Sequence, residues 1–322
     1  MKTLLKNQFR RLIMKKSESI VNATVLIFIF LFLISYFKPE YLLLESTISG
    51  GDTASQYYPA YFLKENILPK LKIVGWCPGW YAGIPMFQFY FPLLFVVSAI
   101  MSYLIPLQIS FKLVTILGTF LLPVATFLCM KFMKFKFPIP IIAAIFTLPF
   151  LFNQGNSMWG GNIPSTLAGE FSYSFSLSLM VLLSGLIYKG VEEKRFVIKN
   201  SIIFALMALT HIITVIVFVL ASSFFLIKKK FLSNLKYLLL VYFLAFLLIS
   251  FWFLPFVLNL KYTTKFFVKW AYGDMRKEIF PDVLIPFYIL SLYGFFRALG
   301  EKDKRILFLS FFIFVSIGIK IF

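Results

Sequence analysis

Long runs of apolar residues recur along the whole chain and are separated by short polar stretches. Their residues do not alternate between apolar and polar, as a strand of a membrane β-barrel does over about 10 positions. Several runs approach the roughly 20 residues with which a helix crosses a bilayer, and a helix satisfies its backbone hydrogen bonds within lipid. The pattern therefore predicts an all-α polytopic membrane protein. The apolar runs cover residues 19–37, 90–106, 108–130, 137–153, 171–188, 197–227, 236–258, 283–299 and 305–322.

Two runs leave the number of crossings open. Residues 90–106 are barely enough for a span, and the 31 residues of 197–227 would extend about 46 Å as one helix, which is long for one span and short for two. If 90–106 lies in the outer interface and 197–227 forms two short helices, 21 basic residues lie in the cytoplasm and 10 outside. If 90–106 spans and 197–227 crosses once, the numbers are 14 and 17. Because Lys and Arg concentrate in cytoplasmic segments, we predict about nine transmembrane helices and a cytoplasmic N-terminus.

This topology makes residues 1–322 a single transmembrane domain. Residues 38–106 form a first external loop that carries interfacial helices, and residues 108–322 form the helical bundle. The first span lacks a following small-residue cleavage site, so we expect it to remain uncleaved. The bundle stops within or just after an apolar helix, and it is expected to be C-terminally incomplete, as a shorter family member or a piece of a longer protein.

Composition and charge agree with this class. The chain is 60% hydrophobic and 14% charged, whereas soluble globular proteins are about 25% charged. The net charge of +19 would indicate nucleic acid in a soluble protein. In a membrane protein it indicates basic residues beside cytoplasmic lipid headgroups, so we expect membrane lipids as partners and no nucleic acid. One histidine and two cysteines exclude the usual Cys/His zinc cage.

Two carboxylates stand out by their position. Asp52 follows two glycines shortly after the first span, and Glu170 ends the second external segment, residues 154–170. Both are predicted at the same membrane face, where together they could hold a divalent cation such as Mg²⁺ or Mn²⁺, or one could act as a general base. Each also has a structural alternative. Asp52 could cap a helix that begins near Ser55, and Glu170 could stabilise the start of the next span through the helix dipole.

Other polar and aromatic residues at this face are candidates for substrate binding. His211 interrupts the run 197–227 and would mark the junction of two short helices beside a cavity; the alternative is a neutral histidine hydrogen-bonded to another span. Lys261, Lys265 and Lys269 would suit the phosphate or pyrophosphate of a lipid carrier, although a solvated loop against headgroups would have the same composition.

Trp80 and Trp159 belong to a group of external aromatic residues. Their rings could stack on sugars, and the alternative is the aromatic belt that marks a membrane interface.

Several motifs resemble those of a known family. They are D…Q..P from Asp52, W.PGW..GIP from Trp76, FYFPLLF from Phe89, Trp159-Gly160-Gly161, LAGEF from Leu167, Leu209-Thr210-His211, and FWFLP from Phe251. On these motifs the region from Gly50 to Phe256 resembles the 6-pyruvoyl-tetrahydropterin synthase-related membrane proteins and, more distantly, the YfhO-like proteins. No pterin chemistry is visible in the chain. One departure is the single proline of Phe91-Pro92-Leu93, where a double proline is expected.

These families look like members of the GT-C superfamily of membrane glycosyltransferases. The resemblance implies a GT-C-like bundle that moves a sugar from a polyprenyl-phosphate carrier to an external glycan or lipid acceptor in cell-envelope assembly, at the outer face of the plasma membrane. By similarity Asp52 takes the first acidic position and Glu170 the second, which is often Asp. Asp52 would be the base or a cation ligand, and Glu170 would share the cation or orient the acceptor. His211 and the lysines would contact the carrier phosphate.

The alternative is a protein without catalytic activity, either a transporter or an assembly subunit for lipid-linked glycans. Transport would predict a polar path that reaches the cytoplasmic side. The cytoplasmic halves of the predicted spans contain few polar residues, which disfavours this alternative.

Overall fold

Helices make up most of the molecule in the computed structural model, which describes residues 2–80, 82–155, 158–227, 230–263 and 281–321. The prediction of an all-α membrane protein is confirmed by five helical segments that are long and apolar enough to cross a bilayer. These segments are Met14–Phe37, Leu107–Phe132, Ile163–Glu193, Phe231–Tyr262 and Asp282–Glu301. Each overlaps one of the predicted apolar runs, because both follow from the same continuous hydrophobicity.

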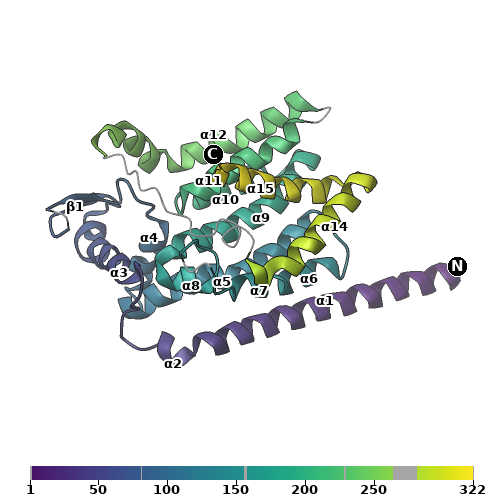
Figure 1. Cartoon of the computed structure of the whole chain (residues 1–322), viewed down its shortest axis with the longest axis horizontal. Helices are drawn as coiled ribbons and strands as arrows, with labels where there is room; N and C mark the ends of the chain where they lie inside the picture. The colour runs from purple at the N-terminus through teal and green to yellow at the C-terminus, as the bar shows by residue number, and fades with distance from the viewer. Residues whose placement is uncertain (1, 81, 156–157, 228–229, 264–280, 322) are drawn as a thin grey trace.

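The main helices follow the chain in order (Figure 1). The first is α1 (Lys2–Phe37), and after the loop come α5 (Leu107–Phe132), α6 (Ile139–Ile145), α7 (Thr147–Leu151), α8 (Ile163–Ser165), α9 (Phe171–Glu193), α10 (Val197–Ala208), α11 (Ile212–Ser222), α12 (Phe231–Asn259), α14 (Ile285–Glu301) and α15 (Lys304–Ile321). Short π or 3₁₀ turns cover Thr166–Glu170, Ser223–Leu226, Leu260–Tyr262 and Asp282–Leu284.

The run 197–227 divides into two short helices, as predicted. Helix α10 ends at Ala208, and α11 begins at Ile212 after an extended His211 with φ −165° and ψ 133°. Both outer ends of the pair lie against the start of α12, because the Tyr237 hydroxyl donates to the carbonyl of Arg195 at 2.7 Å and the Asn234 amide donates to that of Phe225 at 2.8 Å. The pair therefore forms a hairpin whose tip is the segment 209–211.

Three basic connections gather at one end of the bundle, here called the basic end and defined by residues 131–136, 189–199 and 302–305. The Lys134 ammonium lies 3.2 Å from the Glu193 carboxylate, and the Arg305 guanidinium donates to the Lys134 carbonyl at 3.3 Å. Lys194 donates to the Asn234 side chain at 2.7 Å. Charge counting placed these connections together in the cytoplasm, and the structure confirms that they share one end.

The opposite end carries the first loop, and Figure 1 shows β1 and α3 there, far from the N-terminus. This loop end holds α2 (Pro39–Leu42), α3 (Thr53–Phe62), a π turn (Leu63–Ile67), a 3₁₀ turn (Leu68–Lys70) and α4 (Leu93–Met101). It also holds an antiparallel hairpin, β1 (Gly75–Cys77) and β2 (Ile84–Met86), in which Trp76 is opposite Pro85. The hairpin was not predicted. Helix α4 has 9 residues, about 14 Å, which is half the thickness of a bilayer core.

The close packing of α5 against α9 sets the position of the second acidic segment. Backbone atoms of Ser174 and Phe175 crowd Gly118, so a side chain larger than hydrogen would not fit there. The Ser178 hydroxyl donates to the Gly118 carbonyl at 2.9 Å. Small residues at such contacts let two helix backbones approach closely. As a result, the start of α9, immediately after Glu170, is held beside the first half of α5.

A buried lysine fixes the first loop to the same helix. The ammonium of Lys112, on α5, donates to the carbonyls of Tyr41 at 2.7 Å and Leu44 at 2.5 Å. The residue is only 5% exposed, and hydrogen bonds from a charged donor are among the stronger ones. Lys112 therefore anchors the start of the loop that leads to Asp52.

Candidate active site at the loop end

The segments that carry Asp52 and Glu170 lie in direct contact. The backbone N–H of Asp52 donates to the carbonyl of Ala168 at 2.6 Å, and the Thr53 hydroxyl donates to the carbonyl of Leu167 at 2.5 Å. A Cβ atom placed on Gly169 would lie 2.9 Å from Cβ of Asp52. Glu170 follows at once, and the two carboxylates are close enough for their charges to interact. The structure thus brings together the two acidic residues that the same-face argument predicted.

Neither carboxylate caps a helix through its oxygens. Asp52 occupies the N-cap position of α3 and Glu170 that of α9, but neither side chain accepts a hydrogen bond from the helix. The Ser55 hydroxyl instead donates to the Asp52 carbonyl at 2.8 Å. Asp52 is exposed and Glu170 is half-buried. Their charges still favour the helix starts through the dipole, while the carboxylate oxygens have no hydrogen-bond partner recorded among the described residues.

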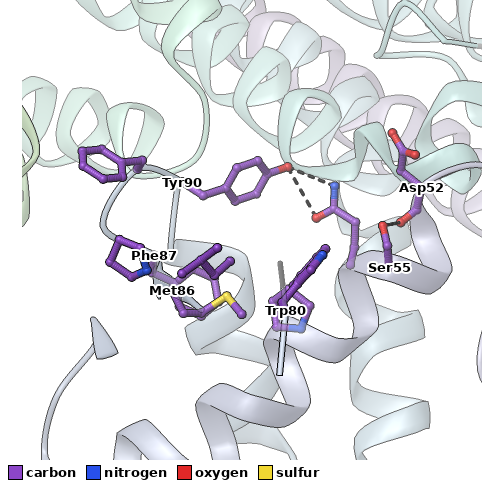
Figure 2. Close-up of a pocket in the computed structure, with 11 residues that line it drawn as sticks. Asp52, Ser55, Trp80, Met86, Phe87 and Tyr90 are labelled. Atoms are coloured by element: carbon purple, nitrogen blue, oxygen red, sulfur yellow. Dashed lines mark hydrogen bonds between the residues drawn. The ribbon is translucent and has the colours of Figure 1, made fainter. Parts of the chain in front are cut away.

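Asp52 borders a cavity of about 390 Å³, here called the first cavity. Its other lining residues are mostly apolar or aromatic: Ser55, Gln56, Pro59, Trp80, Ile84, Pro85, Met86, Phe87, Phe89 and Tyr90. Figure 2 shows the Tyr90 phenol reaching across from the opposite wall toward the side of Asp52, with Trp80 below. Trp80, predicted as a sugar-stacking residue, therefore lines the same cavity as the predicted base. An apolar pocket with a few convergent polar groups is typical of small-molecule sites.

Tyr90 and Gln56 form a polar pair inside this cavity. The Gln56 amide nitrogen lies 3.0 Å from the Tyr90 hydroxyl, and the amide oxygen lies 3.4 Å from it. Burial raises the pKa of Tyr90, and the nearby charges of Glu170 and Asp52 raise it further, although the hydrogen bond with Gln56 opposes them. The phenol therefore stays neutral and can donate a hydrogen bond to a ligand.

Neither residue was predicted to belong to the site, although both stand in motifs that carry the family resemblance. Gln56 stands four residues after Asp52, which places both on one face of α3. Tyr90 belongs to the FYFPLLF motif, but nothing in its spacing indicates that it faces Gln56, because their pairing depends on how the chain returns after the hairpin.

His211 lies at the junction of α10 and α11, as predicted. Its ring centroid is 5.5 Å from that of Phe91 and 5.2 Å from that of Tyr173. Nδ1 accepts the N–H of Ile213 at 3.3 Å, which assigns the ring proton to Nε2 in a neutral imidazole. A neighbouring backbone bond, from Leu93 to the Leu209 carbonyl at 3.1 Å, ties this junction to the start of α4. His211 is not among the residues that line the first cavity.

Trp159 and Lys261, two other predicted binding residues, do not line the first cavity. Trp159 is 46% exposed and precedes Gly160, which packs against the Tyr173 ring. Lys261 lies in the turn after α12, with its ammonium 5.0 Å from the centroid of the Tyr262 ring. The other two predicted phosphate-binding residues, Lys265 and Lys269, lie outside the described residues.

The donor set suits a cation that is shared with a substrate. Within the described ranges there is no group of three or more His, Cys, Asp and Glu side chains that could enclose a metal ion. Mg²⁺, however, is commonly held by one or two carboxylates together with waters and substrate phosphates. Asp52 and Glu170 would fit that arrangement and would supply its protein ligands.

Comparison with known proteins places the chain in a family. The family model described as "6-pyruvoyl-tetrahydropterin synthase related domain; membrane protein" matches residues 87–317, more than two thirds of the chain. The chain belongs to this family. No curated protein and no solved structure matches it. The predicted resemblance is thereby confirmed, and the protein is a 6-pyruvoyl-tetrahydropterin synthase-related membrane protein.

The matched region differs from the predicted one at both ends. It begins at residue 87 and continues to 317, whereas the motifs had indicated Gly50 to Phe256. The family region therefore includes Glu170, His211 and Tyr90 but excludes Asp52 and Trp80. In this family member, the segment before the matched region supplies one of the two carboxylates and much of the first cavity.

Proposed function

We propose that this protein is a GT-C-like membrane glycosyltransferase that moves a sugar from a polyprenyl-phosphate carrier to an external glycan or lipid acceptor in cell-envelope assembly. The observation that carries the proposal is the pairing of the Asp52 and Glu170 segments beside a cavity lined by aromatic residues at the loop end. A carboxylate without a hydrogen-bonded partner among the described residues is available to a substrate, and aromatic walls suit the apolar faces of sugar rings.

In the proposed reaction the acceptor hydroxyl attacks the anomeric carbon of the donor sugar. As the new C–O bond forms, the proton of the hydroxyl passes to the Asp52 carboxylate, and the bond from the anomeric carbon to the carrier phosphate breaks. The electron pair leaves with the polyprenyl phosphate. Tyr90 would orient a sugar hydroxyl through its phenol, and Trp80 would cover the ring and exclude water. Lys261 and the Nε2–H of His211 would offset negative charge on the leaving phosphate.

The role of Glu170 in this scheme depends on that of Asp52. It would orient the acceptor if Asp52 acts as the base, and it would share a divalent cation if Asp52 is a ligand. The cation would supply a Lewis acid for the leaving phosphate. Both versions need the two carboxylates at the same end of the bundle.

The proposal includes the nine-crossing topology, with the basic end in the cytoplasm and the loop end outside. The hairpin of α10 and α11 supports it, because the His211 junction lies at the loop end and both outer ends lie at the basic end. The short α4 supports an interfacial position for 90–106, since its 9 residues fall well short of a crossing.

Single cysteines test this orientation. Lys70 at the loop end and Lys302 at the basic end are both exposed, and the natural Cys77 and Cys129 are buried and should label slowly. We expect a membrane-impermeant maleimide to label Lys70→Cys in intact cells or spheroplasts and to label Lys302→Cys only after permeabilisation. Labelling in the reverse order would contradict the orientation and would place Asp52 in the cytoplasm.

The function itself is tested by supplying the purified protein with labelled polyprenyl-phosphate hexoses and following release of sugar from the carrier. We expect release that requires the intact Asp52 carboxylate. If no donor is consumed while the protein binds the lipid-linked sugar, the result favours a transporter or assembly subunit and rejects catalysis.

A further inference from the structure

A second cavity adjoins the first at the loop end. It has a volume of about 680 Å³, within the range of about 300–1,000 Å³ that small-molecule sites occupy. It shares Pro85 and Phe89 with the first cavity, so the two cavities are neighbours. Its lining residues come from the hairpin and from the end of α12: Trp76, Gly83, Pro85, Gln88, Phe89, Asn259, Tyr262 and Thr263.

The walls of this second cavity are held together by contacts between the hairpin and α12. The indole N–H of Trp252 donates to the carbonyl of Phe87 at 2.8 Å, and this bond is buried. The ring centroids of Phe89 and Phe256 lie 6.1 Å apart. The segment after β2 is therefore fixed to the last turns of α12, and the cavity between them is part of the folded structure.

Two exposed aromatic rings flank the cavity. Trp76 is 64% exposed and Tyr262 is 72% exposed. The Trp76 indole packs on the bare Cα of Gly83, where a Cβ atom would collide with the ring, and its backbone pairs with Pro85 across the hairpin. A large exposed ring that the fold holds in one place can offer a flat apolar surface to a ligand at low entropic cost.

The polar side chains of the cavity are neutral: the amides of Gln88 and Asn259 and the hydroxyls of Tyr262 and Thr263. The Nε2 atom of Gln88 is buried and has no hydrogen-bond partner among the described residues, and such a donor is costly unless something pairs with it. The Asn259 amide is anchored by a 2.7 Å bond to the Pro255 carbonyl. No Asp, Glu, Lys or Arg is among the described residues that line this cavity. Fixed aromatic rings with neutral amides match a ligand that has apolar C–H faces and many hydroxyls.

We propose that the second cavity is a carbohydrate-binding subsite for a neutral sugar. A ring would lie on Trp76 or Tyr262, and a hydroxyl would pair with the Gln88 amide once that side chain turns toward it. Because the two cavities share two lining residues, a sugar bound in the second would lie next to the one that reaches Asp52 in the first. Its assignment as the acceptor subsite rests on the proposed function, whereas carbohydrate binding does not.

The test measures binding of short oligomers of glucose, mannose, galactose and N-acetylglucosamine to the full chain by saturation-transfer NMR and calorimetry. The detergent must lack a sugar headgroup, since a glycoside would compete for the site. We expect at least one oligomer to bind, and Trp76→Ala to weaken its binding about tenfold or more. Gln88→Met should weaken it about threefold to tenfold, as expected for one lost hydrogen bond. Thermal stability should not fall in Gln88→Met, because no recorded bond of the free protein is lost.

A pair of tyrosines provides a matched control. Tyr262→Ala should weaken binding, whereas Tyr103→Ala should leave it within twofold. Tyr103 is similarly exposed, at 60%, and lies in the first loop, which also carries Trp76, but it lines neither cavity. This comparison separates contact with the sugar from the general loss of an exposed aromatic ring.

The result that overturns the subsite is an absence of binding by every oligomer, or equal binding by the natural chain and by Trp76→Ala, Gln88→Met and Tyr262→Ala. Reduced retention of these variants in lipid nanodiscs, with sugar binding unchanged, would also overturn it and would assign the rings to headgroup anchoring. If an oligomer binds and Trp76→Ala weakens that binding, but Asp52→Asn leaves sugar transfer unchanged, the proposed mechanism is rejected and the subsite is retained. If sugar transfer requires Asp52 but no oligomer binds, the subsite is rejected and the proposed mechanism is retained.

Discussion

Replacing Asp52 with Asn is expected to lower the rate of sugar transfer about 100-fold to 10,000-fold, which is the usual contribution of a positioned general base. Asparagine has the same shape but cannot accept the proton of the acceptor hydroxyl. The Asp52 carboxylate has no hydrogen bond recorded among the described residues, and the bond that holds this segment to Ala168 comes from the backbone. The variant should therefore fold normally. The measurement is the initial rate of labelled sugar release from the polyprenyl-phosphate donor.

Glu65→Gln is the matched control for this loss. Glu65 is another acidic residue of the same loop, with its side chain 46% exposed and a 3.5 Å ion pair to Lys64. Neutralising it should leave the transfer rate within twofold, because exposed ion pairs contribute little. If Asp52→Asn transfers sugar as fast as Glu65→Gln and the natural chain, Asp52 has no part in the chemistry.

Manganese binding distinguishes the two roles proposed for Asp52. If Asp52 and Glu170 share a divalent cation, Mn²⁺ binding followed by electron paramagnetic resonance should weaken in both Asp52→Asn and Glu170→Gln, and chelation should stop transfer. If Asp52 acts only as a base, Mn²⁺ binding should be the same in all three proteins while Asp52→Asn still loses transfer.

Replacing Gly51 with Ala should have the second largest effect. Gly51 has φ +50°, and a Cβ atom there would collide with the backbone carbonyl of Ala168. Because that oxygen accepts the Asp52 N–H, the two acidic segments would have to move apart. We expect a loss of about 1–3 kcal/mol in stability, as in other overpacked sites. Transfer should fall more than tenfold, since small displacements of reacting groups are costly.

The control for this change is Gly155→Ala, in the segment that leads to Glu170. A Cβ atom on Gly155 would have one neighbour, the Asn153 side-chain oxygen at 3.4 Å, and its backbone N–H would still donate to that oxygen. Thermal unfolding and transfer should match the natural chain. Full activity and stability in Gly51→Ala would show that the close contact between the two acidic segments is unimportant.

The positions of the long helices were accessible from the sequence, because hydrophobicity acts locally along the chain, but their ends were not: α1 begins at Lys2 rather than near Ser19. Charge counting also identified the 197–227 hairpin, although the junction at Leu209–His211 contains no glycine or proline. The basic residues at 189–199 and 228–236 share a compartment only if residues 197–227 turn back as a hairpin. The structure agrees, since Lys194, before α10, donates to the Asn234 side chain at the start of α12 at 2.7 Å.

The β-hairpin at Gly75–Met86 was not predicted, because its sequence carries little local signal. Its strands have three residues each and contain no clear alternation of apolar and polar positions. What holds it is contact with distant residues, above all the bond from Trp252 to Phe87, which are 165 positions apart. Such a contact leaves no periodic signal within the segment itself.

The sequence by itself determined that this is a helical membrane protein and that two carboxylates share one end, because apolar runs and basic residues each have direct consequences in a bilayer. Only the tertiary structure decided that the segments carrying these carboxylates are in direct contact. Thr53 and Leu167 are 114 positions apart, and they meet because α5 packs on α9 through Gly118 while Lys112 holds the loop in place. The Gln56–Tyr90 pair and the second cavity likewise depend on side-chain packing across the fold, which no local pattern encodes.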